Sequence, residues 1–273
     1  GEGSVNVNKV GTYEIVFNAT DSSGNKSLEV KRTVTVVDTV GPTIELNGSA
    51  SLKLEAGTPY IELGATAFDL NEKINDILIT GEVNNLVVGT YFLTYTATDS
   101  SNNSSSVVRS IEIVDTTAPV ITLNGPQSVT VERGSSYVDL GAVSNDLVDG
   151  QKQLIGEGSV DVNRTGTYEI KFNTTDSSGN RSLEVKRIVA VVDTVGPTIQ
   201  LNGSASLQLE AGTPYLEFGA TAFDLNEKIT DILITGEVNN LVVGTYFVTY
   251  TATDNSKNSS SVVRTIEIVD TTA

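Results

Sequence analysis

The chain has 273 residues and a formal charge of −17, and it contains no Cys, His, Met or Trp. Without Cys and His, zinc, copper, iron–sulfur and haem sites lose their usual ligands, and the Ser–His–Asp and Cys–His nucleophile systems are excluded. Oxygen ligands from Asp, Glu, Asn and backbone carbonyls remain, and these suit calcium or magnesium. The composition therefore predicts a protein that is not an enzyme and requires no cofactor, with calcium as the candidate ion.

The negative charge also restricts the partners of the chain. Phosphate binding needs clustered Lys and Arg, so neither nucleic acid nor an anionic membrane surface is an expected partner. No apolar stretch approaches the ~20 residues that span a bilayer, so membrane insertion is not expected. The simplest role of the negative charge is to keep a long exposed polymer soluble. The alternative is that the acidic residues bind cations.

An internal repeat organises the sequence. The segment VVDTVGPTI occurs at residues 36–44 and again at 191–199, and the related IVDTTA occurs at 113–118 and 268–273. An Asp in each copy marks a repeat edge about every 77 residues, the size of one small domain. These edges predict four domains, at residues 1–38, 39–115, 116–193 and 194–273.

The repeats are of two types. Residues 41–115 and 196–270 are nearly identical and are called type B, whereas residues 120–193 form a diverged copy called type A. Residues 1–38 match 156–193, the second half of type A. A half sandwich exposes an apolar face and unpaired strand edges, so we expect either a piece cut from a longer array or completion by a strand of a neighbouring molecule.

Within the first type B repeat, alternating apolar residues predict a series of short strands. Turn residues separate them, as in Asn47–Gly48 and Asn84–Asn85. The expected strands are residues 43–46, 51–55, 64–69, 77–83, 91–99 and 107–114, with a polar loop at 70–75. Short strands with a turn every 8–12 residues indicate an all-β fold of tandem immunoglobulin-like sandwiches forming an elongated rod.

Each repeat has a Tyr after a Gly-Thr pair, just before or at the start of the penultimate strand: Tyr13, Tyr91, Tyr168 and Tyr246. This position predicts a tyrosine corner, in which the hydroxyl binds the backbone of the preceding loop. Each repeat also has an Arg in phase with inward residues of the last strand: Arg32, Arg109, Arg187 and Arg264. A half-buried Arg needs a partner, and we expect the Asp that ends the preceding strand (Asp21, Asp99, Asp176 or Asp254). The alternative is an Arg at the rim of the sandwich with its head in water.

The pattern APVITLNG…VERGSSYVDLGA…NDLVDG…GTYEIKFNTTDSSGNRS resembles the bacterial immunoglobulin-like repeats of giant surface adhesins and cell-surface proteins. A relative also occurs as an accessory domain of an insecticidal crystal protein. The resemblance covers the whole chain. It implies an extracellular, surface-displayed array whose modules act mostly as spacers.

Acidic residues form the one constellation that could bind a ligand. Aspartates lie in the linkers, before the last hairpin turn, and in a third set after the GA-x-x-x motif (Asp69, Asp146 and Asp224). If the first two sets meet at a junction between domains, they could bind calcium and stiffen the rod. The candidate ligands are Asp38, Asp99, Asp115, Asp176, Asp193 and Asp254. The alternative is that these residues only form turns, as Asp commonly does.

Two functions follow from this organisation. The first is a structural extracellular stalk or filament segment at the cell surface, whose partners are neighbouring copies of the same repeat, with self-assembly into a fibre as one form. The second is an adhesin module that recognises a glycan or a protein. A binder needs exposed aromatic residues, whereas most Tyr and Phe fall on expected core faces; Phe92 and Phe247 fall on an outer face, where we expect a loop to cover them. Asn-x-Ser/Thr sequences such as those at Asn18 and Asn103 are candidates for glycan decoration.

Overall fold

The computed structural model describes residues 1–70, 72–225 and 227–272. The elements of this part of the chain are all β-strands, which confirms the predicted all-β class. The chain divides into two compact units, and each is considered by itself. The first unit contains residues 1–120 with 145–152 and 175–182, and the second contains residues 121–144, 153–174 and 183–273.

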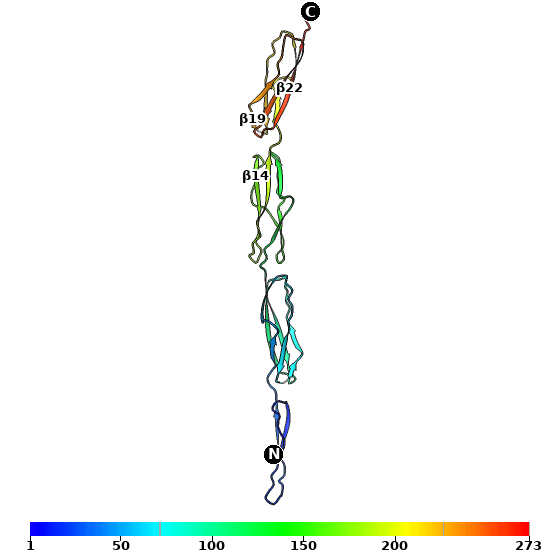
Figure 1. Cartoon of the computed structure of the whole chain (residues 1–273), viewed down its shortest axis with the longest axis vertical. Coiled ribbons are helices and arrows are strands. Elements are labelled where there is room, and N and C mark those ends of the chain that lie inside the picture. The colour runs from blue at the N-terminus through cyan, green and yellow to red at the C-terminus, as the bar shows by residue number, and fades with distance from the viewer. Residues whose placement is uncertain (71, 226, 273) are drawn as a thin grey trace. The chain divides into compact units, whose positions relative to one another are not determined.

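The first type B repeat is a sandwich of two sheets (Figure 1). One sheet has the order β3 (Thr43–Leu46), β5 (Ala65–Asp69) and β6 (Glu72–Ile74). The other has the order β4 (Ser51–Glu55), β9 (Ser104–Val114), β8 (Gly89–Thr98) and β7 (Ile77–Thr80). Because β4 and β9 run parallel while the other pairs are antiparallel, the chain must cross between the sheets, as in immunoglobulin-like folds.

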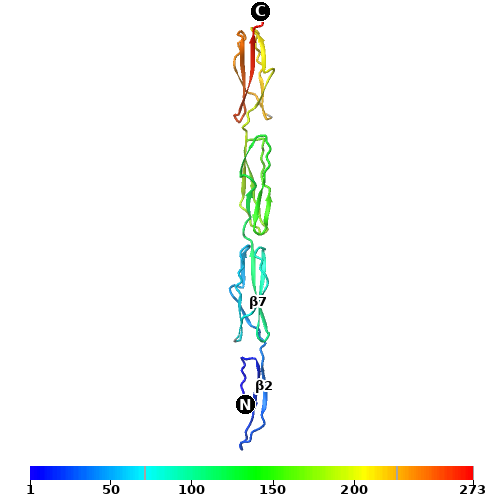
Figure 2. The ribbon, with the colours of Figure 1, turned by 90° about the vertical axis from the view of Figure 1, so that its right-hand side faces the viewer.

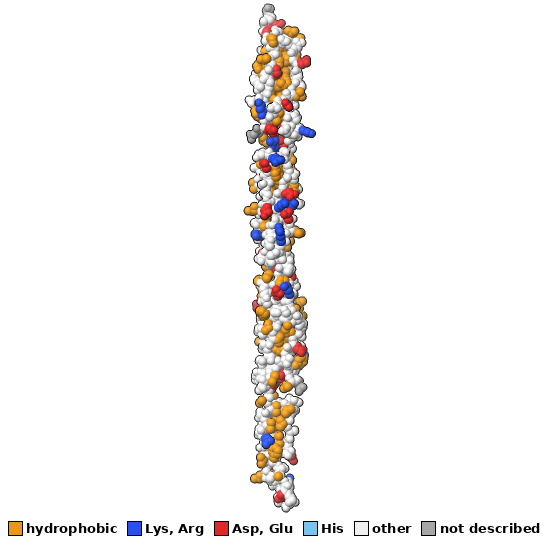
Figure 3. All heavy atoms as spheres, turned by 90° about the vertical axis from the view of Figure 1, so that its left-hand side faces the viewer, with side chains coloured by type: hydrophobic (Ala, Val, Ile, Leu, Met, Phe, Trp, Pro, Cys, Tyr) orange, Lys and Arg blue, Asp and Glu red, His pale blue; other side chains and the backbone are white. Residues whose placement is uncertain are grey.

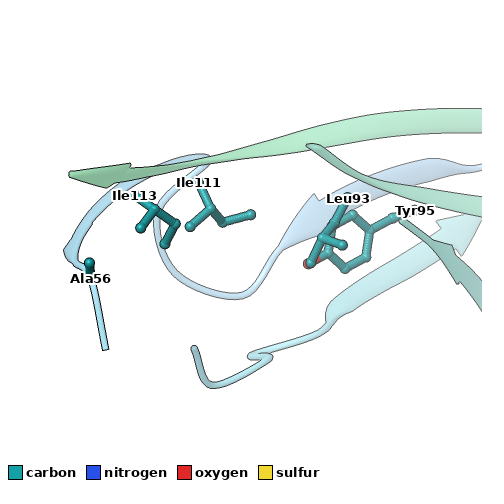
Figure 4. Close-up of a cluster of buried hydrophobic side chains, with 5 residues drawn as sticks. All are labelled: Ala56, Leu93, Tyr95, Ile111 and Ile113. Atoms are coloured by element: carbon teal, nitrogen blue, oxygen red, sulfur yellow. The ribbon is translucent and has the colours of Figure 1, made fainter. Parts of the chain in front are cut away.

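The core of this repeat comes from alternate residues of the long strands. Leu93, Tyr95, Ile111 and Ile113 are buried together, and Ala56 closes the cluster at one end (Figure 4). The register pairs Tyr91 with Ile111, so these apolar side chains share one face. Alternate residues of the strand expected at 91–99 therefore face the core.

The second type B repeat repeats this arrangement within the second unit. Its sheets have the orders β16-β18-β19 and β17-β22-β21-β20. The strands are β16 (Thr198–Leu201), β17 (Ser206–Glu210), β18 (Ala220–Asp224), β19 (Glu227–Ile229), β20 (Ile232–Thr235), β21 (Gly244–Thr253) and β22 (Ser259–Val269). Figure 1 labels β19 and β22 in this repeat.

The type A repeat has six strands in two sheets, with the orders β10-β12-β13 and β11-β15-β14. The strands are β10 (Val120–Leu123), β11 (Ser128–Glu132), β12 (Ala142–Asp146), β13 (Gly150–Leu154), β14 (Gly166–Phe172) and β15 (Val185–Val192). Ala142, Ile170 and Phe172 are buried at its centre. β14 ends at Phe172 and is shorter than β8 and β21.

The N-terminal 38 residues form one antiparallel pair, β1 (Gly11–Phe17) and β2 (Val30–Val36) (Figure 2 labels β2). Apolar side chains of this pair are more open to solvent than in the complete type A repeat: Phe17 is 39% exposed, whereas its counterpart Phe172 is 1% exposed. This exposure agrees with the expectation that these residues are half of a sandwich.

Three local expectations differ from the structure. Residues 70–75 were expected to be a loop, but β6 begins at Glu72, because Leu70 turns the chain with a φ of 43° and Ile74 is buried opposite Ala67; Asn71 lies outside the described residues. The strand expected at residues 77–83 ends at Thr80. Phe92 and Phe247 are 59% and 58% exposed, so the expectation that a loop covers them is wrong.

The tyrosine corner is confirmed in all four repeats. The hydroxyl groups of Tyr13, Tyr91, Tyr168 and Tyr246 each donate a hydrogen bond to the backbone oxygen four residues earlier, at 2.8, 2.9, 2.8 and 3.0 Å. Each bond joins the start of a strand to the loop that precedes it. The corner therefore fixes the entry of the chain into that strand.

The inward arginines have a different partner from the one expected. Arg109 has no exposed surface, and its guanidinium lies 3.1 Å from Glu62 and 2.6 Å from the backbone oxygen of Asn47. Arg264 pairs with Glu217 at 3.0 Å and Arg187 with Asp139 at 2.6 Å. For these three arginines the pairing with the Asp that ends the preceding strand is wrong, and so is the alternative of an arginine head in water. In the N-terminal half, Arg32 is exposed and lies over Phe17.

The acid partner comes from a loop between β4 and β5. A sandwich places this loop against the last strand, although about 47 residues separate them in sequence. Arginine needs several acceptors when it is buried, and the terminal nitrogens of Arg109 meet a carboxylate and two backbone oxygens, whereas its Nε has no hydrogen-bond partner. The sequence phase identified the buried arginine, whereas only the folded topology could identify the acid.

Candidate metal centre

Nine aspartates form three clusters, and in each cluster one carboxylate oxygen from every aspartate lies within 4.8 Å of the others. The clusters are Asp38 with Asp69 and Asp99, Asp115 with Asp146 and Asp176, and Asp193 with Asp224 and Asp254. Each cluster lies inside one unit: the first two in the first unit and the third in the second. The structure thus brings together, in pairs, all six aspartates that the sequence proposed as ligands.

Each cluster is built in the same way. The first Asp follows the last strand of one repeat, as Asp115 follows β9 and Asp193 follows β15. The second Asp ends a strand of the next repeat, as Asp146 ends β12 and Asp224 ends β18. The third lies in the turn before that repeat's last strand. A strand end is a point where the backbone leaves the ladder, so its side chains can face a neighbouring repeat.

The third Asp of each cluster shapes its turn. The Oδ1 of Asp99 accepts the backbone N–H groups of Ser101 and Asn103, both at 2.8 Å. The side-chain amide of Asn103 donates to Asp99 Oδ2 at 2.9 Å and to the backbone oxygen of Asp38 at 3.3 Å. Asn180 and Asn258 make the same bridges to Asp115 and Asp193. These hydrogen bonds show that the third Asp also forms the turn, which the sequence offered as the alternative role. The remaining lone pairs of the carboxylates are left for contacts within the cluster.

A glutamate at the end of another strand also ties neighbouring repeats together. Glu55 accepts the backbone N–H of Thr116 and the hydroxyls of Thr116 and Thr117, each at 2.8 Å. Glu132 accepts the corresponding groups of Thr194 at 2.7 and 2.8 Å. These bonds hold the linker that carries the first Asp of the cluster.

The clustered charges change the acidity of their members. Burial, with the charges of Asp38 and Asp99, raises the pKa of Asp69 above its usual value. Burial and the charge of Asp193 raise the pKa of Asp224 in the same way. By contrast, although burial opposes it, hydrogen bonds from Asn103 hold the pKa of Asp99 below its usual value. In these two clusters the cost of the shared negative charge thus falls on the aspartate at the strand end, Asp69 or Asp224.

One cluster contains a protein cation. The guanidinium Nη1 of Arg133 lies 3.3 Å from Asp193 Oδ2 and 3.3 Å from Asp224 Oδ2. Its Nε donates to the backbone oxygen of Asn163 at 3.1 Å. Arg133 follows β11 directly, and the sequence reasoning did not consider it. The signal was available, because type B has Ala56 and Ala211 at the matching position.

The cluster at Asp115 differs in its charge balance. Ala56 stands at the position that corresponds to Arg133, so the arginine contact of the Asp193 cluster has no counterpart from this position at Asp115, Asp146 and Asp176. Asp115 is only 8% exposed, and its Oδ2 is a buried atom without a hydrogen-bond partner. Elsewhere on the face shown in Figure 3, Lys and Arg are interspersed with Asp and Glu.

The fold and these junctions define a protein of tandem immunoglobulin-like repeats. The family model described as "Bacterial surface protein, Ig-like domain" matches residues 1–36, 44–113, 121–191 and 199–268. The chain belongs to this family and is a surface repeat protein. The resemblance inferred from the sequence is confirmed.

Curated relatives include proteins of very different origin. Hyalin of Strongylocentrotus purpuratus is 30% identical over 291 residues, which is 96% of this chain and 24% of hyalin. Internalin I of Listeria monocytogenes serotype 4b (strain F2365) is 26% identical over 298 residues, which is 98% of this chain and 16% of the internalin. The chain spans 24% to 53% of the length of the first three curated relatives.

Among solved structures, the chain is similar to a Ca²⁺-stabilized adhesin with which an Antarctic bacterium binds ice. The identity is 14%, the TM-score is 0.29, and the match covers 95% of this chain and 82% of the adhesin. No helix among the described residues is long and apolar enough to cross a membrane.

Proposed function

We propose that this segment is an extracellular spacer of a bacterial surface protein, which holds another part of that protein away from the cell. The observation that carries the proposal is the distribution of differences between the two type B repeats. A spacer needs only its fold and its junctions, so its surface is free to vary. A dedicated binding module needs a defined set of surface residues.

The two type B copies differ at nine positions between residues 41–115 and 196–270. Seven of these pairs are exposed in both copies, one is half-buried, and only Leu93 with Val248 is buried. The exposed differences are spread over several strands and loops, and both copies keep the buried arginine, the tyrosine corner and the three junction aspartates. Selection for a common framework explains this pattern.

A second candidate function is an adhesin module, and the exposed phenylalanines favour it. Phe68 and Phe92 are 48% and 59% exposed, and their counterparts Phe223 and Phe247 are 45% and 58% exposed. Aromatic side chains are common anchors in binding surfaces. Since both type B copies carry the same pair, such a surface would be multivalent.

We assign no catalytic step to the segment. The absence of Cys and His from the sequence supports this inference, because the common nucleophile and general-base systems depend on them.

The linker sequence allows a direct test of the spacer. Deletion of residues 39–193 joins Asp38 to Thr194 and regenerates the linker VVDTVGPTI, while it removes one type B and one type A repeat. The chain is anchored to a surface at its N-terminus, and the height of a fluorophore fused after its C-terminus is measured. We expect the deletion to lower the fluorophore.

Binding assays provide the opposing arm. The intact chain and the variant F68S/F92S/F223S/F247S are applied to arrays of glycans and extracellular matrix proteins. The spacer predicts no saturable binding by either protein. Saturable binding that the four substitutions remove would overturn the spacer in favour of the adhesin, as would a deletion that leaves the fluorophore height unchanged.

A further inference from the structure

Two of the aspartate clusters share a framework of hydrogen bonds and differ at a position that carries a cation in one of them. In both, an Asn side chain bridges the first and third Asp, and a Glu at the end of a neighbouring strand binds the linker threonine. The differing position follows that Glu directly. It is Ala56 beside the Asp115 cluster and Arg133 beside the Asp193 cluster.

The backbone shows that these two positions are equivalent. The N–H of Ala56 donates to the backbone oxygen of Val114 at 2.7 Å, and the N–H of Arg133 donates to that of Val192 at 2.6 Å. Each acceptor immediately precedes the first Asp of its cluster. A long basic side chain at this position therefore reaches the carboxylates, and a methyl group does not.

The electrostatic consequence is large. The Asp193 cluster contains a guanidinium in contact with two of its three carboxylates. The Asp115 cluster has three carboxylates with oxygens within 4.8 Å of one another, and Ala56 stands where the Asp193 cluster has Arg133. A buried carboxylate oxygen without a donor or a cation is costly; Asp115 Oδ1 accepts the N–H of Thr117 at 3.1 Å, but its buried Oδ2 has no hydrogen-bond partner.

We propose that Asp115, Asp146 and Asp176 bind one divalent metal ion, calcium in an extracellular setting, and that Arg133 replaces this ion in the Asp193 cluster. Calcium takes six to eight oxygen ligands at flexible geometry, and carboxylates, backbone oxygens and water supply them. Junctions that need the metal and junctions that carry their own cation thus occur in one chain. Extracellular calcium modules bind with dissociation constants of about 10⁻⁴–10⁻³ M.

The donor geometry supports this assignment. Asp146 Oδ1 accepts the N–H groups of Val148 and Asp149 at 2.8 and 3.0 Å, and Asp176 accepts both N–H and amide donors of Asn180. These bonds fix the carboxylates through neutral donors, so they orient the ligands without cancelling their charge. The neighbouring Asp149 is bound to Ser177.

The test is a calcium titration of the chelator-treated full chain by isothermal calorimetry, with thermal melts in calcium and in chelator. Asp115→Asn is expected to remove one equivalent of bound calcium, because it keeps the shape and removes the charge. The matched control is Asp21→Asn, which alters the same Asp-x-x-x-Asn turn outside these clusters. An unchanged stoichiometry in a folded Asp115→Asn protein would overturn the site.

The arginine half of the proposal has its own variants. Arg133→Ala places at this position the residue that both type B repeats already have, and we expect it to add one equivalent of calcium. Ala56→Arg is expected to remove one equivalent and to make the melt of that junction independent of calcium. At tenfold calcium over the dissociation constant, the calcium-dependent shift in melting temperature is expected to be on the order of 5 °C.

The two variants separate the two parts of the proposal, the calcium site at Asp115 and the replacement of the ion by Arg133. If Arg133→Ala gains one equivalent of bound calcium and Asp115→Asn loses one, both parts of the proposal are supported. Loss in Asp115→Asn without a gain in Arg133→Ala overturns the equivalence of arginine and metal. Magnesium titrated in parallel identifies the ion, since equal binding of magnesium would overturn the calcium assignment. An ion bound by Asp38, Asp69 and Asp99 would raise every stoichiometry equally, so the differences between variants are the readout. None of these outcomes depends on whether the chain is a spacer.

Discussion

The type A and type B repeats bury an arginine at the same strand position but satisfy it with different groups. In type B, Glu62 binds Arg109 at 3.1 Å and also accepts the hydroxyl of buried Tyr95 at 2.6 Å. In type A, the acid is the shorter Asp139, at 2.6 Å from Arg187, and Phe172 replaces the tyrosine. The longer acid therefore occurs with the ring that needs an acceptor, and the shorter acid occurs with the ring that needs none.

This difference teaches how a small sandwich without disulfides or tryptophan can fix the position of its sheets. A buried charge is weak evidence for stability by itself, because desolvation offsets attraction. It becomes more specific when its donors meet acceptors, and each repeat type supplies its own acid and ring, although the Nε of Arg109 is buried without a hydrogen-bond partner. Substituting the arginine, the acid or the ring one at a time should show how much each side chain contributes to the stability of its repeat.

The largest effect is expected from removal of the arginine. Arg109→Ala leaves the Glu62 carboxylate and the backbone oxygen of Asn47 without their donor, and we expect a loss of about 3–5 kcal/mol in the free energy of unfolding of that repeat. Hydrogen exchange followed by mass spectrometry resolves each repeat, and the intact Arg264 copy is the internal reference. Arg32→Ala should change the exchange little, because Arg32 is exposed. Equal losses in both variants would contradict the role of burial.

The next effect is expected from the tyrosine hydroxyl. Tyr95→Phe gives the type B repeat the ring of type A, and the loss of a hydrogen bond to a charged acceptor should cost about 1.5–3 kcal/mol. The reverse variant Phe172→Tyr should also destabilise, since it buries a hydroxyl near an acid that already binds Tyr137. Stabilisation by either exchange would show that the pairs are not matched.

A pH dependence of smaller size should follow from the same acids. Burial opposes it, but hydrogen bonds from Tyr95 and Tyr60 keep the pKa of Glu62 below its usual value, and similar bonds lower the pKa of Asp139 and Glu217. A lowered folded pKa gives stability that is complete above the unfolded value of about 4.3 and is lost as the pH falls through the folded value. Because Glu62 is one-third exposed, solvent screens part of the effect.

Exchange rates of the three complete repeats should therefore rise on acidification below about pH 5, after correction for the intrinsic exchange rate. Glu62→Gln should flatten this dependence in residues 41–115 and leave residues 196–270 unchanged. If the exchange rates of residues 41–115 still depend on pH after the substitution, other carboxylates cause the acid sensitivity.

The tyrosine corner should show no difference between the types. Tyr91→Phe and Tyr168→Phe each remove one hydrogen bond to a backbone oxygen, of 2.9 and 2.8 Å. Each should cost about 0.5–1.5 kcal/mol. The free energy of unfolding of each repeat is measured by chemical denaturation monitored by hydrogen exchange. A difference between the Tyr91→Phe and Tyr168→Phe losses larger than this range would reveal a role specific to one repeat type.

The smallest effect is expected where the two type B copies differ on their surface. Lys53 lies 3.4 Å from Glu112 with both side chains at least half exposed, and the second copy has Gln208 bonded to Glu267 in its place. Lys53→Gln should change the stability of its repeat by no more than about 0.5 kcal/mol. A larger change would indicate that the surface pair supports the fold.

Much of the fold follows from local pattern. Alternation of apolar residues predicted the long strands, and the Gly-Thr-Tyr segment predicted the tyrosine corner, because both depend on near neighbours in the chain. The repeat edges predicted that linker and turn aspartates meet, and the structure brings Asp115 and Asp176 within one cluster. The third member, Asp146, needed the sheet to place the end of β12 beside them.

What the sequence determined by itself is the periodic content of the protein: the repeat, the strand phase, the buried arginine and the aspartates at the edges. Tertiary structure alone decided the partners of the charges. Arg109 meets Glu62 rather than Asp99, and Arg133 meets Asp193 and Asp224, because two sheets pack face to face and neighbouring repeats adjoin at their ends. Residues separated by about 50–90 positions become neighbours there, and alternation along a single strand carries no information about them.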